Sequence, residues 1–113
     1  MSTPDYVPTR GDLVWISFDP QAGHEQAGRR PAIALATQEY ARRSGLGLFC
    51  PITNQRKGYA FELALPENLP VTGVVLTDQV KSLDWRARKV EYAGLAGDAF
   101  TDRVLHRAGG LLH

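Results

Sequence analysis

The chain has 113 residues and a formal net charge of +1, and 43% of its residues are hydrophobic. This length predicts one domain over residues 1–113, with a modest core that a dimer interface would extend. The single cysteine, Cys50, excludes an internal disulfide, and its place in an apolar run indicates a small buried hydrophobe. With no charged leader and no run of about 18 apolar residues in the sequence, we expect a cytoplasmic protein without a membrane anchor.

Short apolar runs separated by Gly, Pro, Asn and Asp clusters predict a mainly β protein of the barrel or sandwich type. Both alternating faces of residues 13–18 are apolar, so this strand should be central and covered on both sides. Residues 38–43 indicate a helical turn that Gly45 ends, and residues 66–70 indicate a turn. The expected strands are 13–18, 31–37, 46–53, 59–65, 73–77 and 88–94.

The last part of the chain predicts a helix with Asp98 as its N-cap. Apolar residues recur there at helical spacing on one face, and polar residues occupy the other. Gly109 and Gly110 should weaken the last turn by roughly 1 kcal/mol each. The apolar face comprises Phe100, Val104, Ala108 and Leu111 or Leu112.

Basic residues gather in two parts of the chain despite the small net charge. Residues 24–58 carry six basic against two acidic side chains, residues 81–89 carry four against one, and the rest of the chain sums to minus 6. A basic face with salt-dependent affinity for phosphates is one interpretation of this distribution. Ordinary surface charge is the other.

A glycine-rich loop after the first expected strand combines groups that suit phosphodiester cleavage. It carries His24 and Glu25, which can move protons, and Arg30, which can stabilise a negatively charged phosphoryl transition state. The alternative is a solvated turn, because Gly, Asp, Pro, Gln and Arg are also common loop residues.

Several motifs occur in a fixed order along about four fifths of the chain, from Tyr6 to about Tyr92. They are GDLVWI at 11–16, FDP at 18–20, EQ at 25–26, Gly28, RP at 30–31, PIT at 51–53, KGY at 57–59, FE at 61–62 and TDQVKSLDWRAR at 77–88. In these motifs the chain resembles the MazF and PemK toxin family. The resemblance implies a small Src-homology-three-like β-barrel with a C-terminal α-helix. It also implies a homodimeric, sequence-specific endoribonuclease that cleaves single-stranded RNA without a metal or other cofactor and is neutralised by a cognate MazE-like antitoxin.

The family pattern places the catalytic residues at Arg30, Glu25 and Thr53. Arg30 keeps its proton in proteins, so it should bind the scissile phosphate and stabilise the transition state. Glu25 can accept the proton of the substrate's 2′-hydroxyl, and Thr53 can donate a hydrogen bond to a phosphate oxygen. A metal site is not expected, because the acidic residues are dispersed and form neither an HExxH nor an Asp-x-Asp pattern.

His24 competes with Glu25 for the role of proton acceptor, because an ordinary imidazole pKa of about 6.5 suits acid–base work at neutral pH. In PemK-like members of the family a His at this position acts with an Asp and an Arg further along the chain. Here Asp78 is present, but Leu76 stands where that Arg would be. Arg30 with Thr53 is therefore the primary scheme, and His24 and Glu25 remain alternative proton handlers.

RNA recognition is expected in the loop of residues 54–59 and around Gln79 and Lys81, because amides can read base edges and aromatic rings can stack on unpaired bases. For Tyr59 and Trp85 the alternative to RNA contact is packing in the core. For Asp78 and Gln79 the alternative is that their side chains form hydrogen bonds with the backbone at a strand end. The candidates are Asn54, Gln55, Arg56, Lys57, Tyr59, Asp78, Gln79 and Lys81.

Two other functions remain open from the sequence, a gyrase-poisoning toxin and a non-catalytic interaction module on the same barrel. Gyrase-inhibiting relatives have a Trp-bearing C-terminal end, whereas this chain ends Gly-Leu-Leu-His. That difference, with the presence of Arg30 and Thr53, favours RNA cleavage.

Overall fold

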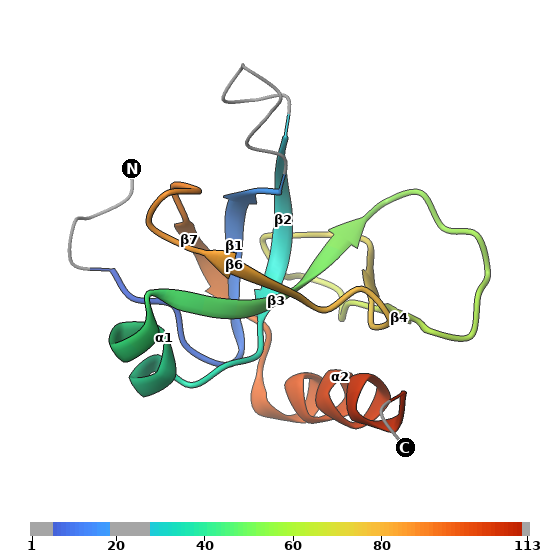
Figure 1. The fold of residues 1–113 in the computed structure, drawn as a ribbon. Coiled ribbons are helices and arrows are strands. Elements are labelled where there is room, and N and C mark those ends of the chain that lie inside the picture. The colour runs from blue at the N-terminus through green and yellow to red at the C-terminus, as the bar shows by residue number, and fades with distance from the viewer. Residues whose placement is uncertain (1–5, 19–27, 112–113) are drawn as a thin grey trace.

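The computed structural model of the chain describes residues 6–18 and 28–111. These residues form antiparallel strands and two helices, with the C-terminal helix beside the sheet (Figure 1). The elements are β1 (Asp12–Ser17), β2 (Arg29–Ala34), α1 (Gln38–Ser44), β3 (Leu46–Thr53), β4 (Glu62–Ala64), β5 (Val74–Leu76), β6 (Lys81–Asp84), β7 (Glu91–Leu95) and α2 (Asp98–Gly110). The predicted mainly β chain with a C-terminal helix is confirmed.

The strands form a seven-stranded sheet in the order β4-β5-β3-β2-β1-β7, with β6 paired to β3. The long strand β3 makes this arrangement possible, because it pairs with β6 near its start, with β2 in its middle and with β5 at its end. Within the described residues no pairing joins β4 to β7, so the sheet is open at these two strands. Closure into a barrel stays a prediction.

Two hydrophobic clusters fill the two sides of the central strands. Leu13 packs with Phe100 and Val104 of α2 in one cluster, whereas Val14 and Ile16 belong to the other. Successive residues of a strand point to opposite faces, so β1 is covered on both sides as predicted for most of its length. Trp15 departs from the prediction, because it is 41% exposed.

The ends of several elements differ from the predicted ones. Gly97, with φ of 92°, is the N-cap of α2, and Asp98 is the first helical residue instead of the cap. The carboxylate of Asp98 thus lies in the first turn, where the helix dipole favours negative charge. Leu111, expected on the apolar face of this helix, is 58% exposed. Gly45 ends α1 in the left-handed conformation, with φ of 74°, as the sequence predicted.

The strand β6 is absent from the predicted elements, and the predicted strand 59–65 is reduced to the three residues of β4. Neither helix in the described parts of the chain is long and apolar enough to cross a membrane.

Candidate active site

Arg30 lies at the end of the β1–β2 hairpin with its side chain exposed to solvent. Its backbone is fixed, because Arg30 pairs with Ile16 and the preceding residue pairs with Ser17. The hairpin ladder is extended by a hydrogen bond of 2.8 Å from the Phe18 N–H to the Gly28 carbonyl. Among the described residues no hydrogen bond or ion pair holds the Arg30 guanidinium, so its donors are available to a phosphate.

The neighbouring Arg29 is held inside the structure. Its Nη2 lies 2.6 Å from Glu91 Oε1 and donates a longer hydrogen bond of 3.4 Å to the Trp15 carbonyl. The Arg29 side chain is 15% exposed. The alternation of a strand therefore turns one of two adjacent arginines toward β7 and the other toward solvent.

Thr53 ends β3 on the strand next to β2. Ala32 pairs with Pro51, Arg30 lies two residues before Ala32, and Thr53 lies two residues after Pro51. Side chains two residues apart on a strand share a face, so Arg30 and Thr53 come to the same end and face of adjacent strands. The Thr53 hydroxyl oxygen accepts the Gln55 N–H at 3.1 Å, which leaves the hydroxyl proton free to be donated.

His24 and Glu25 lie outside the described residues. Their assignment as proton handlers stays a prediction from the sequence.

The predicted recognition loop follows β3 and is exposed over residues 54–60. Its backbone is held by Glu62, whose carboxylate accepts the N–H groups of Lys57 and Gly58, each at 3.0 Å. Gly58 has φ of 79°, a conformation that favours glycine. Sequence reasoning gave Glu62 no role, and the only signal was its place in the FE motif at 61–62.

Side chains in this loop are presented outward. Tyr59 is 52% exposed and stacks on Phe61 with ring centroids 5.1 Å apart. The Asn54 side-chain oxygen accepts the Thr72 hydroxyl at 3.2 Å, which leaves the Asn54 amide N–H groups for a base edge. A rigid exposed ring and an oriented amide suit contacts with unpaired bases.

Lys81, Asp78 and Gln79 come to the surface where the chain enters β6. Lys81 pairs with Phe49, and its Nζ lies 6.0 Å from the centroid of the Phe18 ring at the end of β1. Asp78 and Gln79 are exposed, and among the described residues neither side chain makes a hydrogen bond. Both stay candidates for RNA contact.

Cys50 belongs to the core, as expected from the sequence, and so does Trp85, for which core packing was the alternative to base stacking. Trp85 is 2% exposed, and its Nε1–H donates to the Ala41 carbonyl at 3.1 Å. Cys50 is fully buried, and burial, with a smaller contribution from the charge of Asp78, raises the pKa of its thiol from 9.0 to about 12. Trp85 is therefore an anchor, and the Cys50 thiol stays protonated at neutral pH.

Four exposed cations of the predicted site form no ion pair with any described residue. We call them the site cations: Arg30, Arg56, Lys57 and Lys81.

Comparison with known proteins gives the same family at the levels of sequence and structure. Residues 9–109 match the family described as PemK-like, MazF-like toxin of type II toxin-antitoxin system. The chain is 52% identical to the endoribonuclease toxin MazF of Escherichia coli K12 over 83 residues, 74% of each chain. It is 39% identical to the endoribonuclease toxin ChpB of the same strain over 104 residues, 87% of this chain and 88% of ChpB.

Two solved structures of similar proteins come from Deinococcus radiodurans. A MazF crystal structure aligns with a TM-score of 0.87 and 50% identity over 96% of this chain and 98% of that one. A MazE–MazF complex aligns with a TM-score of 0.84 and 44% identity over 96% and 97% of the two chains. The chain belongs to the PemK-like, MazF-like toxin family.

Proposed function

We propose that the protein is an endoribonuclease toxin that cleaves single-stranded RNA, with mRNA as its substrate in the cytoplasm. The observation that carries the proposal is the pair Arg30 and Thr53 at one end of adjacent strands, with the Arg30 guanidinium unpaired among the described residues. Relatives that are 52% and 39% identical carry the name endoribonuclease toxin, which supports RNA as the substrate.

The chemistry that these residues suit is attack by the 2′-hydroxyl of RNA on the adjacent phosphate. Glu25 or His24 takes the 2′-hydroxyl proton, the 2′-oxygen bonds to phosphorus, and the bond from phosphorus to the 5′-oxygen breaks. The departing oxygen receives a proton, so the products are a 2′,3′-cyclic phosphate and a 5′-hydroxyl. Arg30 stabilises the charge that grows on the phosphate, and Thr53 donates to one of its oxygens.

A cognate MazE-like antitoxin is the proposed protein partner. The Deinococcus MazE–MazF complex, which aligns over 96% of this chain, supports a partner of that kind. The site cations attract phosphates, and they would attract the carboxylates of an acidic antitoxin segment for the same reason. Such a segment, laid over the site, would exclude RNA.

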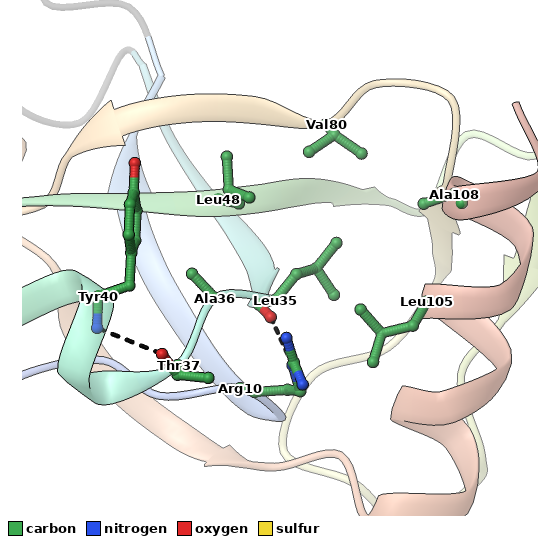
Figure 2. Close-up of a pocket in the computed structure, with 10 residues that line it drawn as sticks. Arg10, Leu35, Ala36, Thr37, Tyr40, Leu48, Val80, Leu105 and Ala108 are labelled. Carbon is green, nitrogen blue, oxygen red and sulfur yellow. Dashed lines mark hydrogen bonds between the residues drawn. The ribbon is translucent and has the colours of Figure 1, made fainter. Parts of the chain in front are cut away.

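An apolar hollow at the opposite end of β2 from Arg30 supports a homodimer. It has a volume of about 480 Å³ and lies between β3, the start of β6 and α2 (Figure 2). Leu48, Val80 and Leu105 border it, with Tyr40 at one side. Tyr40 and Val80 are 43% and 41% exposed, so an apolar surface here is left open to solvent.

We propose that a second copy of the chain covers this hollow. Val80 borders it and stands between Gln79 and Lys81, two of the predicted RNA-binding residues. Docking there would bring the RNA-binding residues of two subunits to one groove. Light scattering that finds a fully active monomer at micromolar concentration would contradict this arrangement.

Mapping the ends of RNA fragments in excess EDTA tests the proposed activity. The purified protein should cut a single-stranded RNA at defined sites and leave 2′,3′-cyclic phosphate and 5′-hydroxyl ends. Activity that disappears with the chelator and returns with magnesium would contradict the mechanism. A toxic protein that cuts no RNA would favour the gyrase-poisoning alternative, and a non-toxic one the interaction module.

A further inference from the structure

Arg88 bonds to the strand that leads into the candidate site. Its Nη1 donates to the carbonyls of Ser17 and Phe18, at 3.1 and 2.8 Å, and its own carbonyl accepts the Ser17 N–H at 3.1 Å. Three hydrogen bonds thus join residue 88 to the end of β1, about 70 residues earlier in the chain. Sequence analysis places Arg88 in the motif at 77–88 and in the second basic segment, but predicts no role for it.

The turn between β6 and β7 that carries Arg88 is itself braced. The Asp84 carboxylate accepts the Ala87 N–H at 3.0 Å, and the Arg88 N–H donates to the Asp84 carbonyl at 3.1 Å. The Val90 N–H donates to the carbonyl of the buried Trp85 at 3.0 Å, so the turn is tied to the core on both sides. Arg88 therefore holds the end of β1 from a turn that is itself fixed.

The segment that Arg88 holds lies directly beside Arg30. Ile16 pairs with Arg30, Ser17 pairs with Arg29, and Phe18 donates to the Gly28 carbonyl. If the end of β1 frayed, these last steps of the ladder would open and the backbone of Arg30 would lose its partner strand. The Phe18 ring, which lies under the ammonium group of Lys81, would shift as well.

We propose that Arg88 is a positioning residue for RNA cleavage, which fixes the end of β1 and through it Arg30, and is not a phosphate-binding residue. The proposal rests on the endoribonuclease function proposed above. Its physical basis is that a small displacement of a transition-state donor lowers the rate steeply, while substrate binding through other contacts continues.

The test compares Arg88→Met, which removes both the charge and the donors, with Arg88→Lys, whose single nitrogen can still bond two carbonyls. Arg103→Ala on α2 is the matched control, because it removes one exposed positive charge outside both basic segments. Cleavage at saturating RNA gives kcat, and an RNA with 2′-deoxyribose at the mapped cleavage position gives Kd over a range of salt.

We expect Arg88→Met to lower kcat by 10- to 100-fold while Kd and its salt dependence stay within twofold of the parent. Arg88→Lys should recover most of kcat, and Arg103→Ala should resemble the parent. A phosphate-binding Arg88 gives a different result: Arg88→Met then raises Kd, reduces the slope of log K against log salt by about 0.7, and leaves kcat unchanged. That outcome, or an unchanged kcat and Kd, would overturn the proposal.

Hydrogen exchange supplies a readout that does not depend on activity. The Phe18 amide should exchange at least tenfold faster in Arg88→Met than in the parent, whereas the amides of Val14 and Ile33 in the core should not change. If the parent cleaves no RNA, the proposed function fails, yet this measurement still decides whether Arg88 holds the end of β1. Should Arg88→Met not fold, Arg88→Gln takes its place in both measurements, and an unchanged Phe18 amide there contradicts the proposal.

Discussion

Arg30→Ala tests the placement of the site most directly. The substitution removes the forked donor that the structure leaves exposed and, among the described residues, unpaired. Loss of one preorganised donor to a transition state typically costs a factor of about 10² to 10³ in rate, or about 3 to 4 kcal/mol. We expect a loss in this range, and a smaller loss for Arg30→Lys, which keeps the charge without the fork.

The fold should survive this change. Arg30 contributes its backbone to the pairing with Ile16, and an alanine keeps that pairing. Loss of a solvent-exposed side chain of this kind, unpaired within residues 6–18 and 28–111, changes the free energy of unfolding by about 0.5 kcal/mol or less. Arg29→Ala is the contrasting variant, because it breaks the contact of 2.6 Å with Glu91, and we expect it to lower the free energy of unfolding by about 1 kcal/mol.

Single-turnover cleavage of an end-labelled RNA, with enzyme in excess, measures the rate of the chemical step. Urea unfolding of the same preparations separates loss of catalysis from loss of fold. Arg103→Ala removes the same charge from α2 and should cleave at the parent rate. A folded Arg30→Ala protein that cleaves RNA within a few-fold of the parent would mean that the site is misplaced.

Thr53→Ala should lower the single-turnover rate less than Arg30→Ala does, because a neutral hydroxyl bonds a phosphate more weakly than a guanidinium. If Glu25 is the base, Glu25→Ala should remove the acid-side limb of the pH–rate profile while His24→Ala retains it; the reverse result would assign the base to His24. The raised thiol pKa of Cys50, about 12 against 9.0, favours the protonated form in the folded state. Its contribution to stability is therefore complete below pH about 9 and lost as the pH rises toward 12, and Cys50→Ala should show a shallower decline in urea unfolding over this range. If only the four site cations contact phosphates, the slope of log K against log salt for single-stranded RNA should be near −3. A slope near −7 would show that all ten basic residues of the two basic segments contact phosphates.

Elements with strong local signals could be predicted from the sequence. The strand β3 has the predicted bounds, Leu46–Thr53, because a continuous apolar run lies between Gly45 and the polar Asn54. Gly45 also ends α1, since a left-handed residue at a helix C-terminus favours glycine. These signals lie within a few residues of the structure that they specify.

Features that depend on distant residues could not be predicted. The strand β6 has four residues and buries only Leu83, and its extended form comes from pairing with β3 more than 30 residues earlier. The contacts of Arg88 with the end of β1 join residues 70 and 71 positions apart. Composition identifies such an arginine as a positive charge, and only the fold decides whether that charge meets a carbonyl, a carboxylate or solvent.

The contacts that the arginines of the two basic segments make bear on how a nearly neutral protein can bind RNA. A count of charges treats all the cations of the two basic segments alike, but Arg29 contacts Glu91 and Arg88 faces main-chain carbonyls. Fewer cations than the sequence suggests are therefore left for phosphates, and the sequence-independent part of the affinity is correspondingly small. We therefore expect contacts with bases to supply the rest of the affinity, and this expectation agrees with the predicted sequence-specific cleavage. The exposed Tyr59 ring and the Asn54 amide, on a loop whose backbone Glu62 holds in place, are the groups best placed to supply it.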